Sequence, residues 1–102
     1  MIHKTARFQV RREGLERSLA AIREFIAFVA TNEPGTLKYE SFQERDDPTK
    51  FEHVFVFRDQ DAERIHSSSA AVERFTAVLY PECLQAVVFT DVTLIASTKS
   101  EP

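Results

Sequence analysis

The chain has 102 residues, of which 43% are apolar and 28% charged, and its formal net charge is −3. This length fits one domain, residues 1–102, and the composition excludes a disordered chain. Acidic and basic residues are interspersed, with no basic cluster beyond the Arg11–Arg12 pair, so nucleic-acid binding is disfavoured. The lone Cys83 excludes an intrachain disulfide and a Cys-rich zinc site. No apolar run has the length of a signal core or a membrane span, and we expect a cytoplasmic protein without membrane contact.

The first half of the chain predicts strand, helix, strand. Residues 2–10 alternate between apolar and polar side chains, which is typical of a strand. From residue 15 the apolar spacing changes to that of an amphipathic helix, with one stripe formed by Leu15, Leu19, Ile22, Ile26 and Val29. Phe25 borders this stripe, and we expect Phe28, on the polar side, to be covered by another segment. Pro34 and Gly35 end the helix, and residues 37–45 predict a second strand.

The second half predicts two more strands around a broken helix. Residues 46–49 have the composition of a turn, and residues 51–57 are strong strand formers, so the second and third strands form an antiparallel hairpin. Residues 59–65 predict a short helix, Ser67 to Ser69 a break, and residues 70–79 a second helical piece that ends at Pro81. Residues 86–96 predict a long final strand, and residues 97–102 a polar, frayed tail.

This order of elements is βαββαβ, the pattern of ferredoxin-like α+β domains. Such a domain has a four-stranded antiparallel sheet with its helices on one face, which leaves the other face uncovered. An uncovered face with many apolar side chains requires a partner. We therefore expect two copies to pack sheet against sheet into a dimeric α/β barrel, through an interface on the order of 2,000 Å² or more.

Several short motifs resemble the antibiotic biosynthesis monooxygenase family, and they follow one another over nearly the whole chain. They are Glu33-Pro34-Gly35-Thr36-Leu37-x-Tyr39, then Asp47-Pro48-x-x-Phe51, then Phe57-x-Asp59-x-x-Ala62-x-x-x-His66-x-x-Ser69, and finally Phe75. The resemblance implies a ferredoxin-like fold that dimerises into an α/β barrel. It also implies kinship with small cofactor-independent monooxygenases that oxidise phenolic or quinol substrates with oxygen, with haem-degrading enzymes and with an aldehyde-metabolite isomerase.

The chain departs from the family pattern at three positions. Where the family often has a Glu on the third strand and a Trp two residues later, this chain has Phe55 and Phe57. Where a second His often follows the serine, this chain has Ala71. Of the Asn, Trp and His that the haem-degrading subgroup uses, only His66 matches clearly, which disfavours haem chemistry here.

His66 is the candidate catalytic residue. Its ordinary pKa near 6.5 suits removal of a proton from a phenol or hydroquinone at neutral pH. The alternative is that His66 only caps a helix end or bonds a carbonyl group. His53 shares a strand face with three Phe side chains and is either an interior residue or a second polar anchor for a substrate. A metal site formed by the two histidines and a carboxylate lacks any supporting ligand spacing.

Further candidates for substrate binding have structural alternatives as well. The Tyr39 hydroxyl either forms a hydrogen bond with a substrate oxygen or lies at the rim of the pocket. The Arg7 guanidinium either stabilises negative charge that develops on the substrate or pairs with an acidic residue across the dimer. Asn32 lines the pocket or only closes the helix. The remaining candidates are aromatic residues that form either a slot for a flat ligand or simply the core: Phe55, Phe57 and Phe75.

We expect no cofactor, because a chain with only Gly14 and Gly35 has no glycine-rich loop for a nucleotide or flavin. A flavin held in some other way is the alternative that the sequence leaves open. The sequence thus favours a cofactor-independent monooxygenase of a small phenolic or quinol substrate. His66 is the base, Tyr39 and Arg7 orient oxygens, and Phe55 and Phe57 sandwich the ring. The alternative is a non-catalytic dimeric domain that binds a small aromatic ligand or serves in assembly.

Overall fold

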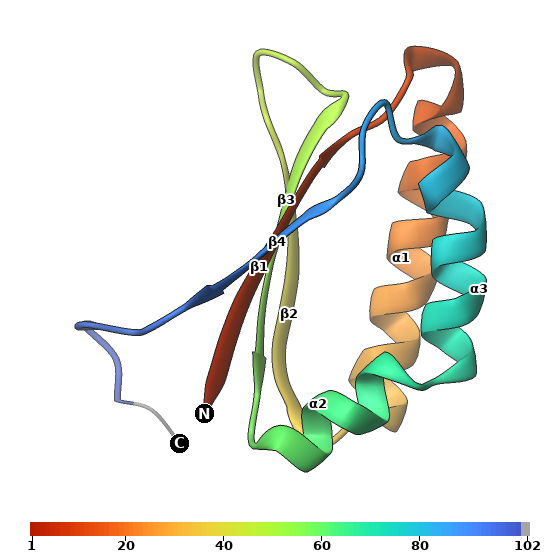
Figure 1. The fold of residues 1–102 in the computed structure, drawn as a ribbon. Coiled ribbons are helices and arrows are strands. Elements are labelled where there is room, and N and C mark those ends of the chain that lie inside the picture. The colour runs from red at the N-terminus through yellow and green to blue at the C-terminus, as the bar shows by residue number, and fades with distance from the viewer. Residues whose placement is uncertain (101–102) are drawn as a thin grey trace.

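A computed structural model describes residues 1–100 of the chain (Figure 1). The elements are β1 (Ile2–Gln9), the 3-10 turn η1 (Arg12–Gly14), α1 (Leu15–Asn32), β2 (Thr36–Gln43), β3 (Lys50–Phe57), α2 (Gln60–Ser67), α3 (Ala70–Leu79), the 3-10 turn η2 (Tyr80–Glu82) and β4 (Val88–Val92). The predicted order βαββαβ is confirmed, with the second helix broken at the serine run. Among residues 1–100, no helix is both long and apolar enough to cross a bilayer.

The strands form one antiparallel sheet in the order β2-β3-β1-β4. Helices α1 and α3 lie side by side on one face of this sheet, and α2 lies near one end of it (Figure 1). The predicted ferredoxin-like α+β fold is therefore correct. Paired residues in such a sheet point to the same face, so the register places Ala6, His53 and Phe89 together on the helix side of three adjacent strands.

The core lies between the helices and this inner face of the sheet. In α1 the buried positions are Ser18, Ile22, Phe25 and Val29, so Phe25 lies at the centre of the buried stripe rather than at its border. Its ring stacks on Phe75 of α3 with centroids 4.4 Å apart, which joins the two helices. Phe28 is half-buried, and the Arg74 guanidinium lies 5.9 Å from its ring centroid, a cation–π contact that covers it as expected.

The final strand is shorter than the predicted residues 86–96. It pairs only with β1, from Arg7 opposite Val88 to His3 opposite Val92. Because β1 begins at Ile2, residues 93–96 have no strand of the same chain beside them, and they continue as an extended segment away from the domain (Figure 1). Of the predicted frayed tail, residues 97–100 form no helix or strand, and residues 101–102 lie outside the described residues.

A buried carboxylate joins the β1–α1 connection to the η2 turn at one end of the sheet. Glu82 of η2 is only 4% exposed, and its oxygens accept hydrogen bonds from Arg11 and Arg17 at 2.7 to 3.2 Å. A side chain at Gly14 would place its Cβ 2.3 Å from Glu82 Oε2. A glycine is thus needed there, because the carboxylate occupies the space of any larger residue.

Candidate functional site

His66 forms a buried pair with Glu33. Its Nδ1 lies 2.7 Å from Glu33 Oε1, and both side chains are almost fully buried. The Thr36 hydroxyl donates to the same oxygen at 2.8 Å. An oxygen with two donors acts as the acceptor, which puts a proton on Nδ1 of His66 and leaves Nε2 as the nitrogen able to take a proton. A carboxylate that orients an imidazole in this way is a common support for a general base.

The motif residues around this pair explain how it assembles. Glu33 follows α1 directly, and the turn through Pro34 and Gly35 leads into β2. A Cβ at Gly35 would lie 2.6 Å from the Cβ of Ala62, so the missing side chain lets α2 pack onto the turn and bring His66 to Glu33. On the other side, the Ser69 amide donates to the His66 carbonyl at 3.2 Å, and the Ser69 hydroxyl caps α3 at Val72.

A second pair joins Tyr39 of β2 and His53 of β3. The Tyr39 hydroxyl lies 2.8 Å from His53 Nδ1, while His53 Nε2 is buried with no hydrogen-bond partner. Burial lowers the pKa of His53 to about 4, so its ring is neutral at pH 7. Burial also raises the pKa of Tyr39, with smaller contributions from Tyr80 and Glu33, so the phenol keeps its proton. The Tyr39 ring is in contact with both imidazoles.

A cavity of about 70 Å³ lies between the sheet and the helices, and Tyr39, His53 and His66 line it. The rest of its lining is mostly apolar and includes Tyr80 and Phe89, which are 47% and 59% exposed and so mark its mouth. A dry cavity that holds benzene has a volume of about 150 Å³. An aromatic ring therefore enters only when the mouth side chains swing outward.

The other predicted site residues divide between this cavity and its surroundings. Phe75 lines the cavity, but Phe55 and Phe57 do not. Their rings instead pack around His66, with centroids 6.3 and 5.1 Å from the imidazole. Asn32 is exposed, and its amide donates to the Phe28 carbonyl at 3.0 Å, which is the helix-closing alternative.

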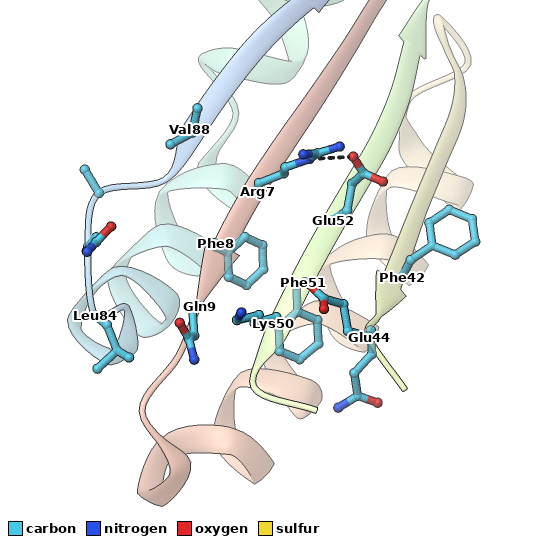
Figure 2. A pocket seen from close by; sticks show the side chains of 13 residues that line it. Arg7, Phe8, Gln9, Phe42, Glu44, Lys50, Phe51, Glu52, Leu84 and Val88 are labelled. Carbon is cyan, nitrogen blue, oxygen red and sulfur yellow. Dashed lines mark hydrogen bonds and ion pairs between the residues drawn. The ribbon is translucent and has the colours of Figure 1, made fainter. Parts of the chain in front are cut away.

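Arg7 lies on the opposite face of the sheet, away from both histidines. It lines an open hollow of about 520 Å³ that spans β1, β3, the end of β2 and the start of β4. Figure 2 shows its side chain pointing toward Glu52, with Phe42 farther off on β2. The Arg7 guanidinium pairs with Glu52 of the same chain at 2.8 Å, so its acidic partner is intramolecular. Most of this hollow is outer-face surface, and the structure brings no histidine to it.

Glu33 is the site residue that pattern analysis missed. It entered the motif only as part of a turn, and it lies 33 residues before His66 in sequence. The two meet only because α2 folds back onto the α1–β2 turn, which no local spacing reveals. Within residues 1–100, no three His, Cys, Asp or Glu side chains form a group suited to a metal ion.

Solved structures share this architecture. An antibiotic biosynthesis monooxygenase matches with a TM-score of 0.86 and 21% identity, over 94% of this chain and 100% of the other. A candidate antibiotic biosynthesis monooxygenase from Bacteroides thetaiotaomicron matches with a TM-score of 0.89 and 19% identity, over 99% and 95% of the two chains. Another from Caulobacter crescentus has a TM-score of 0.86 and 19% identity, over 93% and 90%. At these identities the likeness establishes the fold.

Family membership rests on a separate comparison of the sequence. A search among curated proteins gave no match. The profile of the antibiotic biosynthesis monooxygenase family, in contrast, matches residues 1–78, which include both histidine pairs and all of β1 to β3. This chain belongs to the antibiotic biosynthesis monooxygenase family.

Proposed function

We propose that this protein is a cofactor-independent monooxygenase that oxidises a small phenolic or quinol-type substrate with O₂. The observation that carries the proposal is the buried Glu33–His66 pair on the wall of a mostly apolar cavity. When the mouth side chains swing outward, such an apolar cavity suits an aromatic ring, and the imidazole supplies a base beside it.

In the proposed reaction, His66 Nε2 removes the proton from a ring hydroxyl, and Glu33 stabilises the imidazolium that results. The deprotonated ring is electron-rich enough to reduce O₂ directly. For an anthrone-like phenol, the ring carbon that bears two hydrogens gains one oxygen atom as a carbonyl. The second oxygen atom leaves with those two hydrogens as water, so the substrate supplies all the electrons.

The test is oxygen uptake by the purified protein with a panel of hydroquinones and anthrone-like phenols. We expect uptake above the rate without protein, and a fall of at least about tenfold in His66→Ala, the low end of what a lost general base costs. His3→Gln, checked by light scattering for the same mass as wild type, is the matched control, because the register places His3 on the outer face of the sheet, opposite Val56 and Val92 and away from the cavity. No uptake across the panel, or equal uptake in wild type and His66→Ala, would refute the proposal.

A non-catalytic ligand-binding domain is the second candidate. It is favoured by Phe55 and Phe57, which stand where the family often has Glu and Trp and which make the surroundings of His66 more apolar. This alternative predicts a tight aromatic ligand without turnover. Loss of turnover in His66→Ala would exclude it.

We also propose that the protein is a homodimer whose copies pair through the outer faces of their sheets. Large apolar side chains are exposed on this face on both edge strands, with Phe42 on β2 and Val88 and Val92 on β4. The neighbouring Arg7–Glu52 pair neutralises charge at the centre of the face. The extended residues 93–96, with Ile95 91% exposed, offer further apolar surface to a second copy.

A further inference from the structure

The unpartnered nitrogen of His53 points to a second requirement on the ligand. His53 is 1% exposed, and the Phe8 and Phe75 rings lie within 5.0 and 6.3 Å of its ring. Its only hydrogen bond is to Tyr39, so Nε2 has no partner among the described residues. Because His53 lines the cavity, a molecule bound there is the available partner for Nε2.

The proton positions in the Tyr39–His53 pair follow from counting bonds. If Tyr39 donates to Nδ1, the neutral ring carries its proton on Nε2, and only that one N–H lacks an acceptor. If Nδ1 donates to the hydroxyl instead, both the Tyr39 O–H and the Nε2 lone pair are left unpaired. Each buried unpaired group is costly, so the first arrangement is the stable one. Tyr39 thus fixes His53 as a donor through Nε2.

The two histidines of the cavity therefore have opposite polarity. Glu33 holds the proton of His66 on Nδ1, which leaves Nε2 as an acceptor. Tyr39 holds the proton of His53 on Nε2, which makes that nitrogen a donor. A ligand that satisfies both must carry an O–H group and a separate acceptor oxygen.

We propose that His53 is a specificity-determining residue that donates from Nε2 to a carbonyl or other acceptor oxygen of the ligand, while His66 accepts from a hydroxyl of the same molecule. Tyr39 is a positioning residue that acts through His53. The inference rests on the proposed function in one respect, the assignment of the cavity as the ligand site. An unpaired buried donor costs about 1–3 kcal/mol, so supplying its acceptor raises affinity on the order of tenfold.

The test is the affinity of four probes, measured by calorimetry without turnover: phenol, acetophenone, 3-hydroxyacetophenone and 4-hydroxyacetophenone. We expect at least one hydroxyacetophenone to bind wild type about tenfold more tightly than phenol does. His53→Phe should abolish that advantage. His53→Gln, whose amide both accepts from Tyr39 and donates to the cavity, should restore most of it.

A spectroscopic signature separates this role from simple packing. Imidazole ¹⁵N shifts should show His53 protonated on Nε2 in wild type, and this preference should weaken in Tyr39→Phe. Protonation of His53 on Nδ1 in wild type overturns the inference, as does a failure of wild type to prefer the hydroxyacetophenones or an unchanged preference in His53→Phe. If these binding results hold while no substrate consumes oxygen, the proposed oxidation fails and the specificity of the site stands.

Discussion

Acidification should destabilise the fold through His53. The pKa of this imidazole is lowered from 6.5 to about 4 by burial. As the pH falls, the imidazole therefore becomes protonated in the unfolded chain before it does so in the folded chain. The stability that neutral His53 contributes is thus complete above pH 6.5 and is lost as the pH falls toward 4. Linkage gives a loss of about 2 kcal/mol between pH 7 and pH 5, and about 3 kcal/mol by pH 3.

Denaturant unfolding of wild type and His53→Gln at pH 7 and pH 5, at one protein concentration, isolates this contribution. All other ionisable groups are present in both proteins, and their effects cancel in the comparison. The carboxylates of Asp47, Asp59 and Glu82, whose pKa values are lowered by their hydrogen bonds, do not titrate in this range. We expect wild type to lose about 2 kcal/mol more than the variant. Equal losses in the two proteins would refute the reasoning.

Three further predictions concern other parts of the structure. Glu33→Gln should lower the oxygen-uptake rate at least about tenfold, because an amide orients His66 but does not stabilise its charged form; unchanged uptake would contradict the role of the pair. Gly14→Ala should lower the Tm by roughly 5 °C or more, because the new Cβ would meet the Glu82 carboxylate. In a Glu82→Ala background, where that carboxylate is absent, the same substitution should lower the Tm by clearly less, and equal shifts in both backgrounds would count against this contact. Light scattering should give a particle of twice the chain mass of 11.7 kDa. Phe42→Asp and Val88→Asp should lower that measured mass, whereas Ile65→Asp, on the exposed side of α2, should leave it unchanged; a wild-type monomer at micromolar concentration would refute the dimer.

Periodicity and turn composition were enough to predict the architecture. Alternation identified β1, a run of strong strand formers identified β3, and the Pro34–Gly35 turn placed the end of α1 within a few residues. The length of β4 was not predictable, because apolar residues recur in its sequence up to Ile95 while its pairing stops where β1 begins. Strand length here is set by the partner strand and not by the strand's own residues.

The candidate site was predicted only in part, for a similar reason. His66, His53, Tyr39 and Phe75 all line one cavity. Arg7 was placed with them because sequence alone gives alternation along a strand without saying which face meets the helices. Glu33 was missed as a partner, since its contact with His66 depends on α2 folding back onto the turn. The unpaired Nε2 of His53 likewise has no signature in the sequence.

The carboxylate clamp at Glu82 makes the mouth of the cavity mechanically asymmetric. Tyr80 lies in the same 3-10 turn as Glu82, whose carboxylate binds two arginines and whose carbonyl accepts from the Arg11 amide. Just after the turn, the Leu84 amide donates to the Gln9 carbonyl at the end of β1. Phe89, across the mouth, belongs to an edge strand that pairs with β1 alone. Molecules should therefore enter the cavity when β4 moves outward from the sheet. The exchange rate of a bound ligand should then follow the local opening of that strand, which amide hydrogen exchange measures.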